Sequence, residues 1–504
     1  MSEKFIKINS RDNVAVVLNE INKNTELNIS GEKITSLDNI PVGHKISLQK
    51  IEKGENIIKY GYPIGKATKM INKGEWVHTH NLVTDLSGTD EYSYSKTKFK
   101  EKLNTGIDSK PVFKGYKREK DKTGIRNEIW IINTVGCVNR MSKGFTKKAE
   151  EKYKDKIEKG EIDGIYSFSH PHGCSQLGED LKNTQKILAG LAKHPNAAGV
   201  LVVSLGCEDN QLEDFKNVLG DFNQDRIKFI CLQEEKNEEE AVINKIDKLV
   251  KYASRFKKEE IPVSNLKIGL KCGGSDSLSG ITANPLLGRI SDKLITYGGT
   301  SILSEVPEMF GAEEVLLKRA CNQKVFTQTV KLINDFKEYF IEKGVEIYEN
   351  PAPGNIEGGI TTLEEKSLGN VEKGGSSLIR GVNDYGEQVK GKGLQLLESP
   401  GNDLVSTTAL TAAGAHLVLF TTGRGTPFGG PVPTVKISTN SELASQKKNW
   451  IDFNAGQLLS GKSMEELSDE FFQYIIKIAS CKELTRNELN DFREIAIFKN
   501  GVTV

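Results

Sequence analysis

Short apolar runs separated by glycine and asparagine characterise the first 90 residues of the chain. Three of these runs, at 14–18, 45–48 and 56–60, are too short for helices and lie between turn residues. Few positions repeat with the period of 3.6 residues that one face of a helix requires. We therefore predict a small β-rich domain over residues 1–90.

The pattern changes after a polar, aperiodic segment at 91–115, which is typical of a linker. Continuous apolar runs at 128–134, 164–169 and 199–205 indicate buried strands, and charged segments such as 145–158 are compatible with helices. The cysteines that follow these strands are 37 and 33 residues apart, which fits one strand–helix–strand unit each. The sequence predicts an α/β domain over 116–262.

A second alternation of this kind fills residues 263–504. Strands are predicted at 266–270, 393–397 and 416–420, and a capping box at Ser463–Glu466 predicts the start of a helix. Residues 350–380, rich in proline and glycine, are predicted to form a long irregular segment. The fold class is thus α/β, with a small N-terminal β-rich domain followed by Rossmann-like α/β domains.

Composition and charge exclude several classes of partner. The 504 residues hold 69 Lys and Arg against 68 Asp and Glu, a net charge of +1 that argues against nucleic acid or an anionic membrane. The first residues lack the pattern of a secretory signal, and polar residues interrupt the uncharged stretch 404–423, so no membrane span is predicted. We expect a cytoplasmic protein with reduced thiols.

Glycine is frequent, with 48 residues, and it gathers in polar loops at the predicted strand ends. Ligands of open α/β sheets bind beyond the carboxyl ends of the strands, where glycine lets the backbone approach them closely. A single loop of this kind would be an ordinary turn, but several of the same character favour a binding site. They lie at 135–139, 172–176, 205–210, 271–276 and 422–426.

The seven cysteines form no CxxC pair, so neither a disulfide framework nor a zinc ribbon is predicted. Cys174, Cys207 and Cys272 each follow a strand and adjoin glycine. Three interpretations stay open for them: ligands of an iron–sulfur cluster, a nucleophilic thiol, or small residues that fill tight turns. Cys137 fits the last interpretation best.

Histidines and charged residues supply the other candidates. His78 and His80 alternate along an extended segment, so both imidazoles face one side and suit a divalent metal such as iron or zinc. Charges beside apolar strand ends are costly unless they are paired or used. This argument selects Lys271, Asp276, Glu305, Glu308, Arg126 and Arg424. No dinucleotide fingerprint, complete phosphate loop or serine elbow is present.

The chain resembles the altronate/galactarate dehydratase family from end to end. The resemblance rests on strings such as His78-Thr-His-Asn81, Gly173-Cys-Ser-Gln-Leu-Gly178 and Leu270-Lys-Cys-Gly-Gly-Ser-Asp276. Further strings lie at 43–45, 59–65, 124–128, 194–196, 206–208, 279–285, 305–311, 365–369, 399–403 and 421–427. Strings this long and ordered are specific for the family and less specific for the substrate.

The resemblance implies a hydro-lyase of hexuronate catabolism that converts D-altronate to 2-dehydro-3-deoxy-D-gluconate. Alternatives are a dehydratase of another sugar acid, such as galactarate, or a sugar-acid-binding protein without catalysis. It also implies that the first 90 residues are a SAF-type β domain, and that Fe²⁺, or Mn²⁺ in its place, supports activity. We expect a homo-oligomer.

These considerations give a predicted set of site residues. The catalytic candidates are His78, His80, Lys271, Asp276 and Glu305, with His44 in reserve. Substrate binding is assigned to Arg126, Asn127, Ser275, Asn284 and Arg424, because guanidinium groups pair bidentately with carboxylates. The metal is assigned to His78 and His80, or alternatively to an iron–sulfur cluster on Cys174, Cys207 and Cys272.

Overall fold

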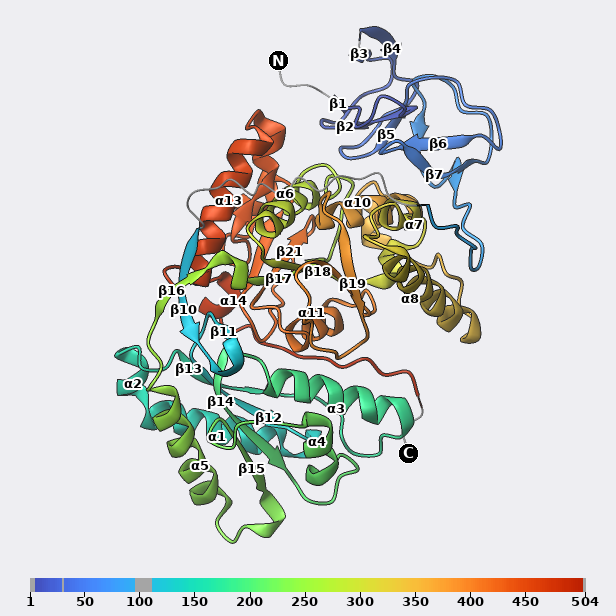
Figure 1. Cartoon of the computed structure of the whole chain (residues 1–504). Helices are drawn as coiled ribbons and strands as arrows, with labels where there is room; N and C mark the ends of the chain where they lie inside the picture. The colour runs from blue at the N-terminus through green and yellow to red at the C-terminus, as the bar shows by residue number, and fades with distance from the viewer. Residues whose placement is uncertain (1–4, 30, 96–110, 502–504) are drawn as a thin grey trace.

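The computed structural model describes residues 5–29, 31–95 and 111–501, and it begins with an antiparallel β domain (Figure 1). Its strands form sheets of order β1-β2-β5-β8, β6-β7-β9 and β3-β4. The predicted runs at 14–18, 45–48 and 56–60 are β2, β5 and β6, so the β-rich prediction is confirmed. The strands are β1 (Phe5–Ile6), β2 (Val14–Val17), β3 (Glu26–Ile29), β4 (Glu32–Thr35), β5 (Lys45–Ser47), β6 (Asn56–Lys59), β7 (Tyr62–Ala67), β8 (Trp76–Val77) and β9 (Leu82–Val83).

A three-stranded antiparallel sheet of order β11-β10-β16 lies between the second and third domains (Figure 1). It consists of β10 (Val112–Lys117), β11 (Thr123–Gly124) and β16 (Glu259–Pro262). The last residues of the predicted linker 91–115 lie in β10, where Val112 pairs with Pro262 and Phe113 is buried. Residues 96–110 of that linker lie outside the described residues.

The second domain is built on a four-stranded parallel sheet of order β13-β12-β14-β15. All residues of β12 and β14 are buried, as expected for a parallel sheet that helices cover on both faces. The predicted strands are confirmed, and the predicted helical segment 145–158 falls on α1 and α2. The elements are α1 (Asn139–Lys152), α2 (Lys154–Glu158), α3 (Gly178–Ala192), α4 (Leu212–Leu219), α5 (Glu238–Ala253), β12 (Glu128–Asn133), β13 (Gly164–Phe168), β14 (Ala197–Ser204) and β15 (Ile227–Cys231).

The third domain carries a seven-stranded parallel sheet of order β19-β20-β18-β17-β21-β22-β23. The predicted strands at 266–270, 393–397 and 416–420 are confirmed as β17, β20 and β21. The strands are β17 (Lys267–Cys272), β18 (Thr300–Leu303), β19 (Ile379–Asn383), β20 (Gly393–Leu397), β21 (Leu417–Thr422), β22 (Thr434–Ser438) and β23 (Phe453–Asn454). The helices are α6 (Ala283–Thr296), α7 (Glu313–Leu317), α8 (Gln323–Glu342), α9 (Pro353–Glu357), α10 (Leu363–Val371), α11 (Asp403–Ala412), α12 (Ser441–Gln446), α13 (Met464–Ala479) and α14 (Arg486–Leu489).

The predicted irregular segment 350–380 is wrong in its centre, where α9 and α10 lie. The Thr362 side chain accepts a hydrogen bond from the backbone N–H of Glu365 and caps α10. Nearly every residue of α10 is buried, so the sequence shows no polar face and no helical period. The capping box predicted at Ser463 and Glu466 is confirmed at the start of α13.

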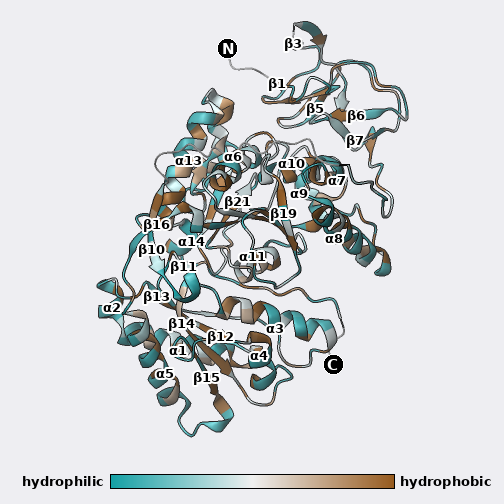
Figure 2. Ribbon diagram, viewed as in Figure 1, coloured by the Kyte–Doolittle hydropathy of each residue, from teal (hydrophilic) through white to brown (hydrophobic). Residues whose placement is uncertain are grey.

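Helices of the second and third domains pack directly on each other. α3 lies against α11, and a Cβ atom at Gly190 would stand 2.7 Å from the carbonyl oxygen of Ala412. Apolar residues of both domains, among them Trp130 of β12, Leu410 of α11 and Val418 of β21, share one core, and Figure 2 shows brown along β12. Within the described residues, no helix combines the length and apolar character that crossing a bilayer demands.

Candidate active site

Charged side chains gather at the carboxyl ends of three neighbouring strands in the third domain. Lys271 and Cys272 end β17, Glu305 follows β18, and Asp403 begins α11 after β20. This edge of a parallel sheet is where ligands of α/β folds bind. Glu305 has a φ of +69°, a left-handed conformation that persists in long side chains mainly at functional sites.

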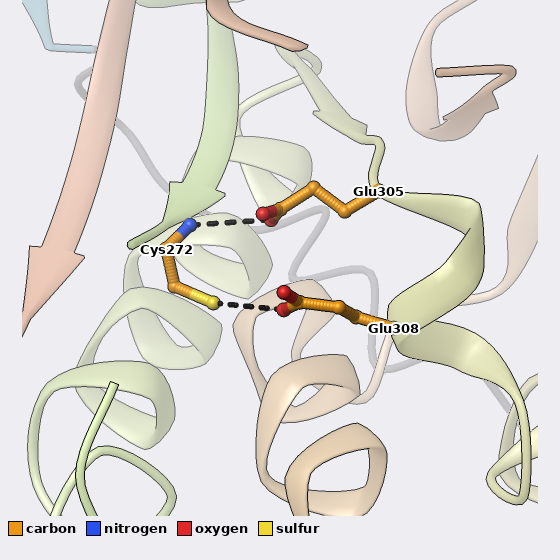
Figure 3. Close-up of side chains that lie close together, drawn as sticks. All are labelled: Cys272, Glu305 and Glu308. Carbon is orange, nitrogen blue, oxygen red and sulfur yellow. Dashed lines mark hydrogen bonds between the residues drawn. The ribbon is translucent and has the colours of Figure 1, made fainter. Parts of the chain in front are cut away.

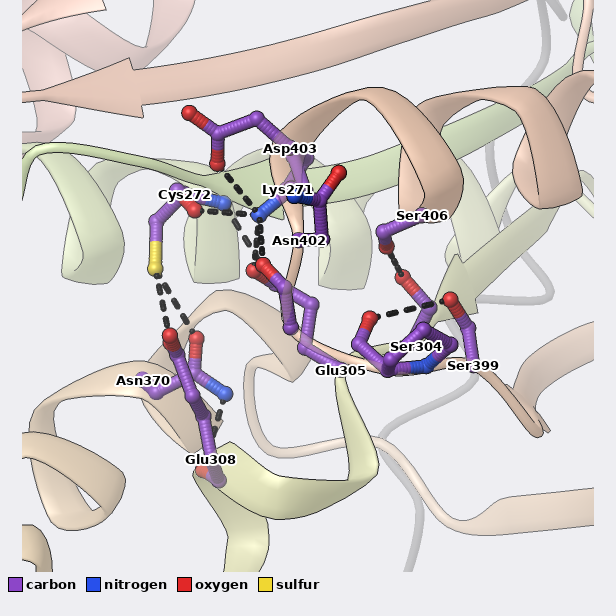
Figure 4. Close-up of polar contacts among 12 residues, drawn as sticks. Lys271, Cys272, Ser304, Glu305, Glu308, Asn370, Ser399, Asn402, Asp403 and Ser406 are labelled. Carbon is purple, nitrogen blue, oxygen red and sulfur yellow. Dashed lines mark hydrogen bonds and ion pairs between the residues drawn. The ribbon is translucent and has the colours of Figure 1, made fainter. Parts of the chain in front are cut away.

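Lys271 and Glu305 form the centre of a buried ion-pair network (Figure 4). The Lys271 Nζ atom lies 3.0 Å from Asp403 Oδ1 and donates to the Gly401 carbonyl oxygen at 3.1 Å. Glu305 Oε2 also pairs with Lys373 Nζ at 2.6 Å. Burial alone would lower the pKa of Lys271, but the charges of Glu305 and Asp403 outweigh it and raise that pKa. Lys271 is therefore a permanent cation.

The Cys272 thiol lies between two acceptors beside this network (Figures 3 and 4). Its Sγ atom is 3.3 Å from Glu308 Oε2 and 3.1 Å from Asn370 Oδ1. Burial raises the pKa of Cys272 to about 12, so the thiol is protonated near neutral pH. Burial would raise the pKa of Glu308 as well, but Lys366 at 3.0 Å and two further lysines lower it to about 2.

Cys272, Glu305 and Glu308 also form a possible buried metal site. One ligand atom of each residue lies within 4.8 Å of those of the other two, and no other trio of histidine, cysteine or carboxylate ligands in the described part of the chain is this close. The lone pairs of a carboxylate exceed the contacts that each glutamate makes here, so both retain capacity for a cation. Thiolate and carboxylate together suit a first-row divalent metal.

The N-terminal domain docks beside this cluster through a buried carboxylate of α10. Glu365 accepts Lys45 Nζ at 2.8 Å and Lys59 Nζ at 2.7 Å, and all three side chains are almost fully buried. Burial would raise the pKa of Glu365, but the two lysines lower it far more. The first domain is thereby held against the third by two ammonium groups that share one carboxylate.

A small cavity of about 10 Å³ lies between this docking contact and Cys272. Such a volume holds one water molecule, so a larger ligand requires a displacement of the lining residues. Tyr60 reaches it from the first domain. The third domain lines it with Cys272, Ser275, Asp276, Ser279, Gly280, Asn284, Ile360, Glu365, Lys366 and Gly369.

Three further predicted residues lie at this cavity. Asp276 accepts hydrogen bonds from Ser279 Oγ at 3.0 Å and Thr439 Oγ1 at 2.9 Å, although burial raises its pKa. Asn284 accepts from Thr421 Oγ1 at 2.6 Å, and Ser275 lies beside both in the lining. The structure thus brings Lys271, Glu305, Asp276, Ser275 and Asn284 together.

The predicted histidines lie on the first domain, outside the Cys272 cluster. The rings of His44 and His78 are 4.7 Å apart, and His44 Nδ1 accepts from the Trp76 indole at 3.3 Å. Burial and the nearby Lys45 lower the pKa of His78 to about 4, and its buried Nδ1 has no hydrogen-bond partner within the described residues. His80 is exposed, and the structure does not join His78 and His80 to a third ligand.

The two predicted arginines differ in position. Arg126 is buried and pairs with Glu488 at 2.7 Å, and neighbouring Asn127 donates to backbone carbonyl groups of the second domain. The structure does not bring Arg126 or Asn127 to the cluster. Arg424, in contrast, is half exposed beside Gly274 of the cavity loop and pairs with Glu357 at 2.8 Å.

The alternative cluster of Cys174, Cys207 and Cys272 would draw its ligands from two different sheets. Cys272 is 2% exposed at the end of β17 in the seven-stranded sheet. Cys174 and Cys207 are exposed in loops of the four-stranded sheet. Spacing in the sequence cannot show that the third cysteine belongs to a different sheet, and within the described residues the structure does not join it to the other two.

Sequence reasoning missed several partners that complete the site. Lys366 lies in α10 and Lys373 follows it, and the sequence of α10 carries no helical pattern. Asp403 is the first residue of α11. Lys45 and Lys59 are more than 300 residues away from Glu365 in the chain. The family resemblance could have pointed to these residues, because all of them except Lys373 lie in or beside the strings that carry it.

Three family models match successive parts of the chain. Residues 3–85 match the SAF domain of altronate/galactarate dehydratases, and residues 115–254 match the second domain of D-galactarate dehydratase/altronate hydrolase. Residues 263–503 match the C-terminal domain of D-galactarate/altronate dehydratase. These matches follow the three structural parts of the chain.

Curated relatives are similar over the whole length. The chain is 51% identical to the altronate dehydratase of Bacillus subtilis over 506 residues, which cover all of both chains. It is 49% identical to the altronate dehydratase of Escherichia coli over 502 residues, which cover 99% of this chain and all of the relative. The galactarate dehydratase (L-threo-forming) of Escherichia coli is 30% identical over 95% of this chain and 94% of its own.

Proposed function

The chain belongs to the altronate/galactarate dehydratase family, and we propose from this membership that it removes water from altronate. The observation that carries the proposal is the end-to-end identity of about one half with two altronate dehydratases, against 30% with a galactarate dehydratase. Loss of water from the C2 and C3 positions of such an acid gives an enol, which becomes a 2-keto-3-deoxy acid.

The reaction needs a base for the proton on C2, an acid for the leaving hydroxyl and positive charge beside the developing enediolate. Lys271, Lys366 and Lys373 supply the positive charge, because each is paired in the cluster and buried or nearly so. A preorganised cation in a dry site stabilises such charge more than water does.

We assign the removal of the proton on C2 to the Glu308 carboxylate. Its Oε2 atom contacts the Cys272 thiol, while Oε1 is held by Lys366. With a pKa of about 2, the carboxylate is unprotonated, and each oxygen keeps a lone pair that can accept a proton. An anionic substrate that draws the lysines to itself raises this pKa, which makes the carboxylate a stronger base.

A divalent ion, Fe²⁺ with Mn²⁺ as a substitute, is proposed at Cys272, Glu305 and Glu308. The spacing of the three ligand atoms and their mixed sulfur and oxygen character support this assignment. The Cys272 thiol must lose its proton to bind, which metal coordination promotes strongly. When bound, such an ion would polarise the substrate carboxylate and hydroxyl.

Asp276, Ser275, Asn284 and Arg424 are proposed to orient the sugar acid. The first three line the cavity, and Arg424 lies at the loop beside it with an exposed guanidinium. His44, His78 and His80 stay candidates for proton transfer from the first domain, and the buried Nδ1 of His78, which has no hydrogen-bond partner within the described residues, supports this role for His78.

A panel of sugar acids tests the proposed function. The purified chain is assayed anaerobically with altronate and with galactarate, with Fe²⁺ or Mn²⁺, and the 2-keto product is trapped with semicarbazide. We expect kcat/KM for altronate to exceed that for galactarate at least ~10-fold, since galactarate carries a second carboxylate and a different hydroxyl configuration, which buried polar groups discriminate. Preference for galactarate, or no keto acid from any sugar acid, would overturn the proposal.

The partners and the compartment stay predictions beyond this substrate. A homo-oligomer is proposed, and light scattering of the purified chain tests it. The cytoplasm stays the expected compartment.

A further inference from the structure

Three loops of the second domain each place a glycine and a cysteine at one edge of the parallel sheet. They contain Cys137 after β12, Cys174 after β13 and Cys207 after β14, and these three strands are neighbours in the order β13-β12-β14 (Figure 1). Carboxyl ends of parallel strands meet at the same edge, so the three loops converge there.

The exposure of these thiols is unusual. Free cysteine is among the most buried residue types in proteins. Of the seven free cysteines, Cys137, Cys174 and Cys207 are the exposed ones, whereas the other four are buried or half-buried. A structural role in tight turns explains one exposed thiol, but it does not explain why all of them lie at one edge of one sheet.

Hydrogen bonds tie the three loops to one another. The Gly136 N–H donates to the His172 carbonyl oxygen at 2.8 Å, and this joins the first loop to the second. Asn210 of the third loop donates its N–H to the Gly173 carbonyl oxygen at 3.1 Å and its Nδ2 to that of Thr134 at 3.0 Å. The backbone that carries the three thiols is therefore a single fixed frame.

The glycines before the cysteines permit this close approach. Gly173 has a φ of +99°, and a Cβ atom there would stand 2.0 Å from the Thr134 carbonyl oxygen. Gly206 has a φ of +127°, and its Cβ atom would meet Gln233 Oε1 at 2.7 Å. Only glycine fits either position, so the turn that presents each following cysteine is built into the sequence.

The strand order adds an independent reason for a ligand at this edge. The chain passes from β12 to β13 on one side and then to β14 on the other. Such a change of direction opens a crevice at the carboxyl ends of the strands, and ligands of open α/β sheets bind there. Cys137 and Cys207 follow the two strands that border this crevice.

We propose that Cys137, Cys174 and Cys207 bind an iron–sulfur cluster of the four-iron type. Thiolates are the ligands of such clusters, and each binds a different iron atom, so their sulfur atoms stand farther apart than ligands of one ion. The hydrogen-bonded loops hold the three cysteines at one edge of the sheet without grouping them, within the described residues, as ligands of a single ion. Cys231 directs its thiol to the Leu205 carbonyl oxygen, which leaves one iron without a cysteine.

This site is separate from the Cys272 cluster, and its occupancy is measured without any turnover. The chain is purified anaerobically and reconstituted with iron and sulfide, and iron, acid-labile sulfide and the electron paramagnetic resonance of the reduced protein are determined. We expect about four iron and four sulfide ions per chain. Cys321→Ser, a free thiol of the third domain, serves as the matched control and should bind as much as the wild type.

Single Cys137→Ser, Cys174→Ser and Cys207→Ser variants should each lose at least half of the sulfide, and the triple variant all of it. Circular dichroism establishes that each variant is folded, and single alanine variants replace any that is not. Wild-type sulfide in the folded triple variant would overturn the proposal. So would a folded wild type that binds no sulfide or binds only zinc.

Discussion

At the scale of single residues, two guanidinium groups are used in different ways. Arg126 makes four hydrogen bonds inside the protein, two of them to Glu488. Among the described residues, Arg424 pairs with the exposed Glu357 alone, beside the cavity loop. A donor group that is satisfied in the interior has little capacity left for a ligand, so Arg424 is the arginine available to a substrate carboxylate.

Replacement of each arginine by glutamine separates these roles. Arg424→Gln should raise KM for altronate ~10-fold or more at unchanged stability, since hydrogen bonds to a charged group contribute about 1.5–3 kcal/mol. Arg126→Gln should lower the free energy of unfolding by about 3–5 kcal/mol, because it leaves Glu488 buried without its partner. Initial rates and denaturant unfolding provide the measurements. A raised KM in a stable Arg126→Gln protein would return that residue to the site.

Charged residues at the ends of apolar strands allowed part of the site to be predicted from the sequence. Lys271, Asp276 and Glu305 were predicted because charges at apolar strand ends are costly unless used, and the structure places all three at the cluster or its cavity. The same argument selected Arg126, whose partner Glu488 is 362 residues away. Sequence alone shows that a charge needs a partner, but not whether that partner is a ligand or another side chain.

At the scale of elements, the end of α3 meets the strand β21 through a buried histidine. His194 is fully buried, its Nε2 bonds the Ala415 carbonyl oxygen at 3.0 Å, and its Nδ1 accepts from the Asn196 N–H at 3.1 Å. Burial lowers the pKa of His194 to about 3, so the ring is neutral in the folded protein. The contact between the second and third domains thus depends on an uncharged imidazole.

The free energy of unfolding should therefore decrease as the pH is lowered below about 6.5. In the unfolded chain the pKa of His194 is near 6.5, so its imidazole binds a proton as the pH falls below that value. In the folded protein the same imidazole stays neutral down to about pH 3. The stabilisation is complete above pH 6.5 and decreases by up to ~1.4 kcal/mol per pH unit below it. His194→Gln, which keeps a donor and an acceptor, should show a shallower slope between pH 6 and 4 in denaturant unfolding. Equal slopes would contradict this account.

Strands with a continuous apolar run could be predicted from the sequence, whereas elements that bury polar side chains could not. The runs of β12, β14 and β20 read as strands because a parallel sheet buries both faces. α10 was missed because its polar residues Glu365, Lys366 and Asn370 are drawn into the site instead of forming a solvent face. β22 carries Lys436, which bonds backbone carbonyl groups in the interior. Buried polar side chains of this kind interrupt the hydrophobic pattern from which helices and strands are predicted.

At the scale of the whole molecule, the N-terminal domain is held in place by two lysines on one carboxylate. Lys45 and Lys59 reach Glu365 from strands β5 and β6, next to the cavity. Removal of the carboxylate leaves two buried ammonium groups that repel each other. The cost of a buried charge without a partner, about 3–5 kcal/mol, falls on the contact between the domains.

Glu365→Gln should therefore loosen the first domain selectively. Hydrogen exchange of residues 5–85 should accelerate, while exchange in the strands β12 and β14 of the second domain stays at wild-type rates. Glu128→Gln is the matched control, since it removes a buried carboxylate that pairs with Arg493 far along the chain. Unchanged exchange in the first domain of Glu365→Gln would show that the triad does not hold it.

If the cluster of Cys272, Glu305 and Glu308 dehydrates altronate, the Glu308→Gln variant must lose most of its turnover. Glu313→Gln removes a carboxylate in a comparable buried ion pair with Lys337, outside the cluster, and is the matched control. We predict that Glu308→Gln lowers kcat on altronate at least ~100-fold, as expected for a lost proton acceptor, while Glu313→Gln keeps wild-type kcat at a similar Tm. A folded Glu308→Gln enzyme with wild-type kcat would contradict the account.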